Sequence, residues 1–136
     1  LDLKPVILSI LIGVNDMWHK MSGTYDGTVA DYGKQFAALL KRTRTALPEV
    51  RLIVCDPFAL RCGAINDTWF PEFTERRALA KKVADDAGAD FVPFQSMFDQ
   101  AIASGTEPAY WAADGVHPTP AGHALMAKTW REVVGI

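Results

Sequence analysis

Residues 114–130 contain an aspartate and a histidine whose spacing could support acid–base chemistry. Asp114 lies three residues before His117, and Pro118 directly follows the histidine. A histidine acts as a general base when a carboxylate on one ring nitrogen fixes its tautomer and orientation. The same spacing suits an Asx-type turn in which Asp114 only closes the loop. The pair alone therefore leaves both interpretations open.

A second polar motif follows the first apolar run of the chain. It reads G-V-N-D and extends from Gly13 to Asp16. A glycine lets the backbone approach a ligand closely, and the side-chain amide of Asn15 could donate a hydrogen bond to a developing oxyanion. An ordinary turn after a strand would also explain these residue types.

Three short apolar runs predict buried strands, and amphipathic segments between them predict helices. The strands are apolar on both alternating faces, which is typical of a sheet covered on both sides. The order predicts one α/β domain over residues 1–136, with a flavodoxin-like, doubly wound parallel sheet in three α/β/α layers. Ligands bind beyond the carboxyl ends of such strands, where both motifs could meet. The predicted strands are 6–13, 51–55 and 90–94, and the predicted helices are 28–46, 72–87, 95–103 and one that starts at Pro120 after the N-cap Thr119.

Composition excludes several function classes. Fourteen basic and sixteen acidic residues give a formal net charge of −2, which argues against a nucleic-acid partner. No apolar run approaches the roughly 20 residues of a membrane span. The adjacent basic pairs, 76–77 and 81–82, predict solvated helix faces. Two cysteines, Cys55 and Cys62, do not indicate a disulfide framework or a zinc site, and we expect no metal. The compartment stays open, with the cytoplasm favoured.

The G-V-N-D and D-x-x-H motifs, in this order on an α/β pattern, resemble those of the SGNH hydrolases, also called GDSL esterases and lipases. The resemblance implies an ester hydrolase that works through a serine nucleophile, without a metal or an organic cofactor. It also implies that His117 is the general base, that Asp114 orients it, and that Asn15 belongs to the oxyanion hole.

Within that family, the segments ILIGVNDMW and WAADGVHPTPAGH look most like bacterial esterases that remove acetyl groups from carbohydrates. The resemblance implies a small ester substrate, such as an acetylated sugar. Gly13, Trp18 and Trp111 flank the two motifs and are candidates for substrate contact. Plain core packing is the alternative for both tryptophans.

The family's G-D-S motif is absent from this sequence. None of the four serines follows a strand in the corresponding place, and the glycine segment of the oxyanion hole is absent too. We therefore expect the chain to be the C-terminal portion of such a fold, inactive alone, with its nucleophile on an upstream companion segment or chain that also covers the exposed first strand. The alternative is a non-catalytic module that binds a sugar or another protein. The long loop 62–73 suits either a lid or an oligomer contact, so a homo-oligomer is a further candidate partner. The serines are Ser9, Ser22, Ser96 and Ser104.

Overall fold

Three parallel strands form the central sheet of the computed structural model, which describes residues 3–136. The strands are β1 (Ile7–Ile10), β2 (Arg51–Cys55) and β3 (Asp90–Val92), and they lie side by side in that order. Ile7 pairs with Arg51, and Ile53 pairs with Asp90. The predicted α/β class and the parallel sheet are confirmed.

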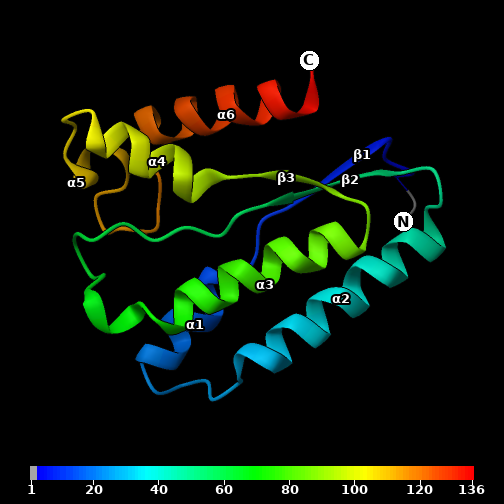
Figure 1. The fold of residues 1–136 in the computed structure, drawn as a ribbon, viewed down its shortest axis with the longest axis horizontal. Coiled ribbons are helices and arrows are strands. Elements are labelled where there is room, and N and C mark those ends of the chain that lie inside the picture. The colour runs from blue at the N-terminus through cyan, green and yellow to red at the C-terminus, as the bar shows by residue number, and fades with distance from the viewer. Residues whose placement is uncertain (1–2) are drawn as a thin grey trace.

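Helices cover both faces of this sheet. Figure 1 shows α2 and α3 along one face and α4 and α6 along the other, so the molecule has the predicted three layers. The helices described within residues 3–136 are α1 (Val14–Met21), α2 (Val29–Ala46), α3 (Glu72–Asp86), α4 (Phe94–Ala103), α5 (Pro108–Trp111), α6 (Pro120–Val134) and the 3₁₀ helix η1 (Asp67–Trp69).

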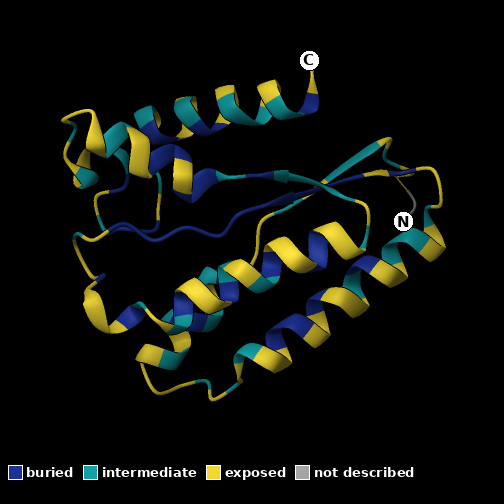
Figure 2. Ribbon diagram, in the orientation of Figure 1, coloured by how far each residue is buried: buried dark blue, intermediate teal, exposed yellow. Residues whose placement is uncertain are grey.

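Strand β2 is buried on both faces because its side chains alternate between two cores. Ile53 and Cys55 pack with the residues of α4 and α6, including Phe98. Val54 points the other way and packs with α2 and α3, including Leu40. Burial continues past the strand into the following loop, which Figure 2 shows as one long dark segment. This alternation explains why the strand is apolar at every position after Arg51.

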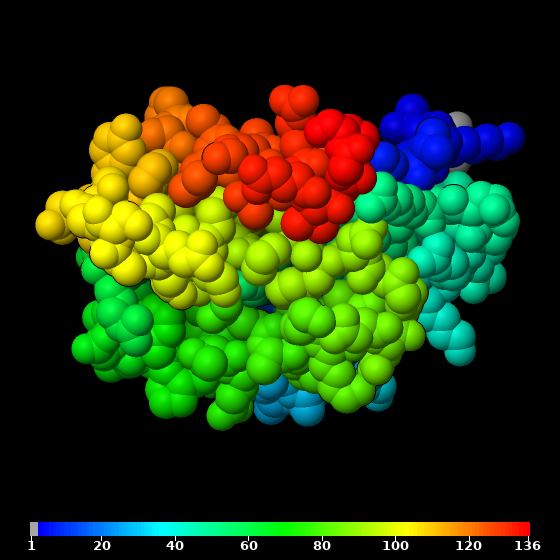
Figure 3. All heavy atoms as spheres, turned by 45° about the horizontal axis from the view of Figure 1, so that its top comes forward, coloured from blue at the N-terminus to red at the C-terminus, as the bar shows by residue number. Residues whose placement is uncertain are grey.

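Strand β1 is the edge of the described sheet and pairs there only with β2. The residues around it expose apolar side chains, with Val6 80%, Leu11 45% and Ile12 40% exposed. Figure 3 shows the N-terminal residues at one end of the molecule, beyond the atoms of α6. An open edge with apolar neighbours is a surface that natural proteins cover.

Two predicted strands were too long, and the short helices α1 and α5 were not predicted. The first strand covers only residues 7–10, since residues 14–21 form helix α1. Val14, Met17 and Trp18 in that helix have the three- and four-residue spacing of an apolar helical face. The third strand ends at Val92, because Pro93 has no N–H for the ladder and precedes α4.

The predicted surface position of one basic pair was also wrong. Arg76 is completely buried, and its neighbour Arg77 forms an ion pair with the buried carboxylate of Asp56 at 2.8 Å. Lys81 and Lys82 are exposed, as predicted, and each is paired with an aspartate one helical turn later.

Further features bear on the function classes. Both cysteines are free thiols. Within residues 3–136, no helix has the length and apolar content to cross a bilayer. The same part of the chain contains no group of three metal-ligating side chains.

Candidate active site

Asp114 and His117 are in direct contact. Nδ1 of His117 lies 2.6 Å from Oδ2 of Asp114, while Oδ1 accepts hydrogen bonds from the backbone N–H groups of Val116 at 3.0 Å and His117 at 2.8 Å. The carboxylate thus closes an Asx-type turn and holds the imidazole at the same time. The two interpretations of this spacing describe one and the same loop.

The Asp114 carboxyl is held in its ionised form. Partial burial raises its pKa, but the hydrogen bonds from the backbone and ring of His117 and from Val116 outweigh that effect and lower the pKa to about 2. An ionised carboxylate can only accept, so the proton between the two side chains resides on Nδ1. In the neutral imidazole, the other ring nitrogen, Nε2, then carries no proton and is able to take one. The His117 side chain is 80% exposed, which leaves Nε2 accessible.

The lowered pKa of Asp114 predicts how the loop responds to acid. Because its pKa in the folded chain is below the ordinary 3.8, the carboxylate stabilises the loop above that pH, and this contribution is lost as the pH falls through about 2. A ¹³C NMR titration of the Asp114 side chain should show a midpoint near 2, and the midpoint should rise in His117→Ala. A midpoint near 3.8 in the unmodified chain would contradict the hydrogen-bond pattern.

The segment after β2 holds this loop from behind. Its backbone donates from Leu60 N–H to Gly115 O at 2.8 Å and from Ala64 N–H to Asp114 O at 3.2 Å. Gln95 on α4 accepts from Ala59 N–H at 2.9 Å. Residues 57–60 are buried, so this part of the chain, which precedes the loop 62–73, belongs to the core.

Two glycines make this close approach possible. A Cβ at Gly115 would lie 2.6 Å from Leu60 O and 2.8 Å from Cys62 O, and a Cβ at Gly63 would lie 2.5 Å from Asp114 Cα. Gly115 also has a φ of +93°, a conformation that L side chains rarely adopt. The contact between these two segments was not predicted, because the two glycines are its only signal in the sequence.

Asn15 lies in the first turn of α1, with an exposed side chain. Gly13 is the buried N-cap of the helix at φ +125°. The hydroxyl of Tyr32 on α2 donates to Ile12 O at 3.2 Å and occupies the space that a Cβ at Gly13 would need. The predicted turn after β1 is therefore a helix start, and a neighbouring helix fixes its entry.

Helix α1, which begins in the second motif, contacts the first motif through Trp18. Trp18 makes an edge contact with the imidazole of His117, with ring centroids 6.4 Å apart, and another with Trp69 at 5.7 Å. Trp18 and Asn15 are three residues apart in the helix, so both project on the same side. Trp111 on α5 instead packs with Phe98 and the core of α4 and α6.

No serine hydrogen-bonds His117 within the part of the chain that the structure describes. Ser9 accepts from Trp130 Nε1 at 2.8 Å. Ser22 and Ser104 donate to backbone carbonyls of their own helices. The site thus contains an imidazole oriented by a carboxylate, and Asn15 on the neighbouring helix α1 is the candidate oxyanion donor.

Comparisons with known proteins show which family the chain resembles. A sequence model of the GDSL-like Lipase/Acylhydrolase family matches residues 1–125. An acetylxylan esterase from Geobacillus stearothermophilus is 28% identical over 134 residues, which are 97% of this chain and 60% of that protein.

Solved structures are similar over nearly the whole chain. One described as a GDSL-like lipase, from Parabacteroides merdae, has a TM-score of 0.94 at 46% identity, with 98% of this chain and 62% of that one covered. Another is a catalytic mutant of the Geobacillus stearothermophilus acetylxylan esterase Axe2, in which a histidine is replaced by alanine. It has a TM-score of 0.83 at 26% identity, with 99% and 62% covered. This chain therefore spans about three fifths of the length of these relatives.

Proposed function

Since this chain belongs to the GDSL-like lipase/acylhydrolase family, we propose that it supplies the base and oxyanion donor of an SGNH-type ester hydrolase. The observation that carries the proposal is the 2.6 Å contact between Nδ1 of His117 and Asp114. It orients the imidazole and leaves Nε2 as the general base. A catalytic mutant of a relative that replaces a histidine supports this role.

The proposed reaction is acyl transfer through a serine. The hydroxyl oxygen attacks the ester carbonyl carbon while Nε2 of His117 takes its proton, and the carbonyl π electrons move onto oxygen. The side-chain amide of Asn15 donates to that oxyanion, an interaction worth about 3 kcal/mol in comparable enzymes. The imidazolium, stabilised by Asp114, protonates the departing alkoxide. Water deprotonated by the same nitrogen then releases the acid and the serine.

The nucleophile in this proposal comes from an upstream companion segment or chain with a G-D-S motif. We place that segment along the free edge of β1, where Leu11 and Ile12 are exposed. A groove of about 480 Å³ runs from there past Gly13 and Asn15 to Tyr32. A strand paired at this edge would end next to Asn15, because parallel strands share their carboxyl ends.

The substrate class that we propose is a short acyl ester, with acetylated carbohydrates as the leading candidate. The name of the acetylxylan esterase relative supports this class. Trp18, in edge contact with His117, is an aromatic wall on which a sugar ring could stack, and Gly13 lies at the start of the same helix. Trp111 packs mainly into the core, so we propose only an indirect role for it.

A non-catalytic module is the second candidate function. It is favoured by the absence, among residues 3–136, of a serine that hydrogen-bonds His117. In that case the open edge of β1 would bind a sugar, another protein or a second copy of the chain.

Active-site labelling distinguishes the two candidates. A fluorophosphonate, which reacts with activated serines, is added to the native preparation, and the products are weighed by intact-mass spectrometry. We expect an adduct on a companion segment with a G-D-S motif. The adduct should disappear in His117→Ala and persist in His123→Ala, which changes an exposed histidine on α6.

Two other labelling outcomes would contradict parts of the proposal. An adduct on one of the four serines of this chain would contradict the proposed source of the nucleophile. The absence of any adduct, with a folded chain and no companion segment, would contradict the hydrolase and support the binding module.

A further inference from the structure

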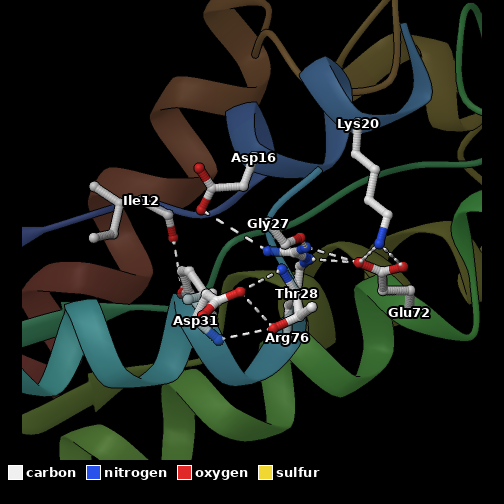
Figure 4. Close-up of polar contacts among 9 residues, drawn as sticks. Ile12, Asp16, Lys20, Gly27, Thr28, Asp31, Glu72 and Arg76 are labelled. Carbon is white, nitrogen blue, oxygen red and sulfur yellow. Dashed lines mark hydrogen bonds and ion pairs between the residues drawn. The ribbon is translucent and has the colours of Figure 1, made fainter. Parts of the chain in front are cut away.

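A buried arginine joins three elements beneath the G-V-N-D motif. Arg76 on α3 has no exposed surface, and its Nη2 donates to Gly27 O at 2.8 Å and to Glu72 Oε1 at 2.7 Å. Nε also donates to Glu72, at 3.2 Å. The third nitrogen, Nη1, is buried without a hydrogen-bond partner among residues 3–136. The acidic oxygen paired with it is Oδ2 of Asp16, 4.0 Å away (Figure 4).

Helix α1 is tied to α3 by two successive contacts. Asp16 faces Arg76, and Lys20, one turn further along α1, donates to both oxygens of Glu72 at 2.9 and 2.7 Å. On each helix the two charged residues are four positions apart, so they lie on one face. Figure 4 shows these side chains pointing toward one another across the gap between the helices.

The Glu72 carboxyl in this cluster is held in its ionised form. Burial raises the pKa of Glu72, but the hydrogen bonds from Lys20 and Arg76 outweigh it and lower the pKa below its ordinary value. A buried guanidinium is stable only where carboxylates and carbonyls replace its water. The remaining N–H groups on Nη1 therefore attract the Asp16 carboxylate, directly or through one water.

Asn15 lies between these tied points and the end of β1. It immediately precedes Asp16, and the guanidinium of Arg76 lies 5.8 Å from the ring of Tyr32, whose hydroxyl donates to Ile12 O. Contacts on both sides of Asn15 thus converge on Arg76. The hydrogen bonds to Glu72 and Gly27 would hold Arg76 in place even without Asp16. The link from Arg76 to α1 therefore depends on Nη1, which faces Asp16.

We infer that Arg76 is a positioning residue that orients Asn15 through Asp16. The inference rests on the proposed role of Asn15 as oxyanion donor. A shift of about 1 Å in a positioned group can lower a rate by about a hundredfold, so a buried charge that fixes the first turn of α1 would act on catalysis without contacting the substrate.

The test reads the side-chain amide of Asn15 by ¹⁵N NMR on the chain itself. The chain has only two asparagines, and Asn66, which caps η1, is the internal reference. In Arg76→Lys, which keeps the charge but loses the forked geometry, the Asn15 amide resonances should shift while those of Asn66 stay in place. Arg77→Lys is the matched control, one residue away on the same helix and also ion-paired, and should leave Asn15 unchanged.

A second pair of variants covers the case in which Arg76→Lys does not fold. Glu72→Gln removes the partner shared by Lys20 and Arg76 and should also move the Asn15 resonances. Glu75→Gln changes an exposed glutamate on the same helix and should not. An unchanged Asn15 amide in folded Arg76→Lys or Glu72→Gln would overturn the inference.

The route through Asp16 has its own test. In an Asp16→Asn background, Arg76→Lys should no longer move the Asn15 resonances, and a shift as large as before would exclude that route. These spectra need no turnover. If the Asn15 resonances shift in Arg76→Lys but the native preparation gives no fluorophosphonate adduct, only the proposed function is contradicted. Turnover is measured in the native preparation that reacts with the fluorophosphonate. There, Arg76→Lys should lower kcat for ester hydrolysis about tenfold and leave KM unchanged.

Discussion

Replacing His117 with alanine should lower kcat/KM for ester hydrolysis by roughly three to four orders of magnitude in the labelled preparation. The variant removes the only group in the loop that Asp114 orients as a base, so the serine proton has no acceptor. The free energy of unfolding should hardly change, because the side chain is 80% exposed and an exposed ion pair contributes little to stability.

Steady-state kinetics with an acetylated xylo-oligosaccharide, together with urea denaturation, would measure both effects. His123→Ala is the control and should match the unmodified chain in both. A His117→Ala chain that loses less than tenfold in kcat/KM would show that another group takes the proton. A large loss of stability would show that the imidazole is a structural element of the loop.

The parts of the fold that depend on local pattern were predicted well. The bounds of β2 agree with its apolar run, and α2 begins one residue after Thr28, whose side chain forms a capping box with Asp31. Helix α6 begins as predicted, with Thr119 accepting from Gly122 N–H and Pro120 in the first turn. Each of these signals lies within a few residues of the element that it specifies.

The elements that were not predicted are short. Their sequence signals extend over only a few residues. Helix α1 has only eight residues, so its apolar face amounts to Val14, Met17 and Trp18. The polar residues between them resemble a turn. A contact with α2 favours the helix over a turn, because Tyr32 holds the backbone of Ile12 where α1 begins.

In the candidate site, too, contacts within one loop could be predicted from the sequence, whereas contacts between distant elements could not. The contact between Asp114 and His117 could be predicted because both residues lie in one tight loop, and the structure places them 2.6 Å apart. The burial of Arg76 could not, since its partners Gly27 and Asp16 are 49 and 60 positions away in the chain, as 76 − 27 and 76 − 16. An E-R-R sequence on a helix is typical of a solvated face, and only the packing of α1 against α3 reverses that.

Gly115→Ala is expected to have a second large effect, on both stability and turnover, because Gly115 packs against the segment after β2. The new Cβ would meet Leu60 O at 2.6 Å, Cys62 O at 2.8 Å and the Ile65 side chain at 2.4 Å. Two of these atoms are backbone and cannot turn away, so the loop that carries Asp114 must move. Strained φ and overpacking together should lower the free energy of unfolding by about 3 kcal/mol. A displacement of about 1 Å should also lower kcat roughly a hundredfold.

Gly105→Ala separates the clash from the backbone strain. Gly105 has a φ of +104°, close to the +93° of Gly115, but a Cβ there would meet nothing within 4 Å. It should cost only about 1 kcal/mol, the strain of a left-handed residue, and leave turnover unaltered because it ends α4 away from the loop. Urea denaturation of both variants measures the difference. Equal losses in the free energy of unfolding would mean that the segment after β2 moves to accept the new Cβ. That segment would then not hold the Asp114–His117 loop in place. A larger loss in Gly115→Ala, accompanied by slower turnover, would make the buried residues 57–60 part of what positions the base.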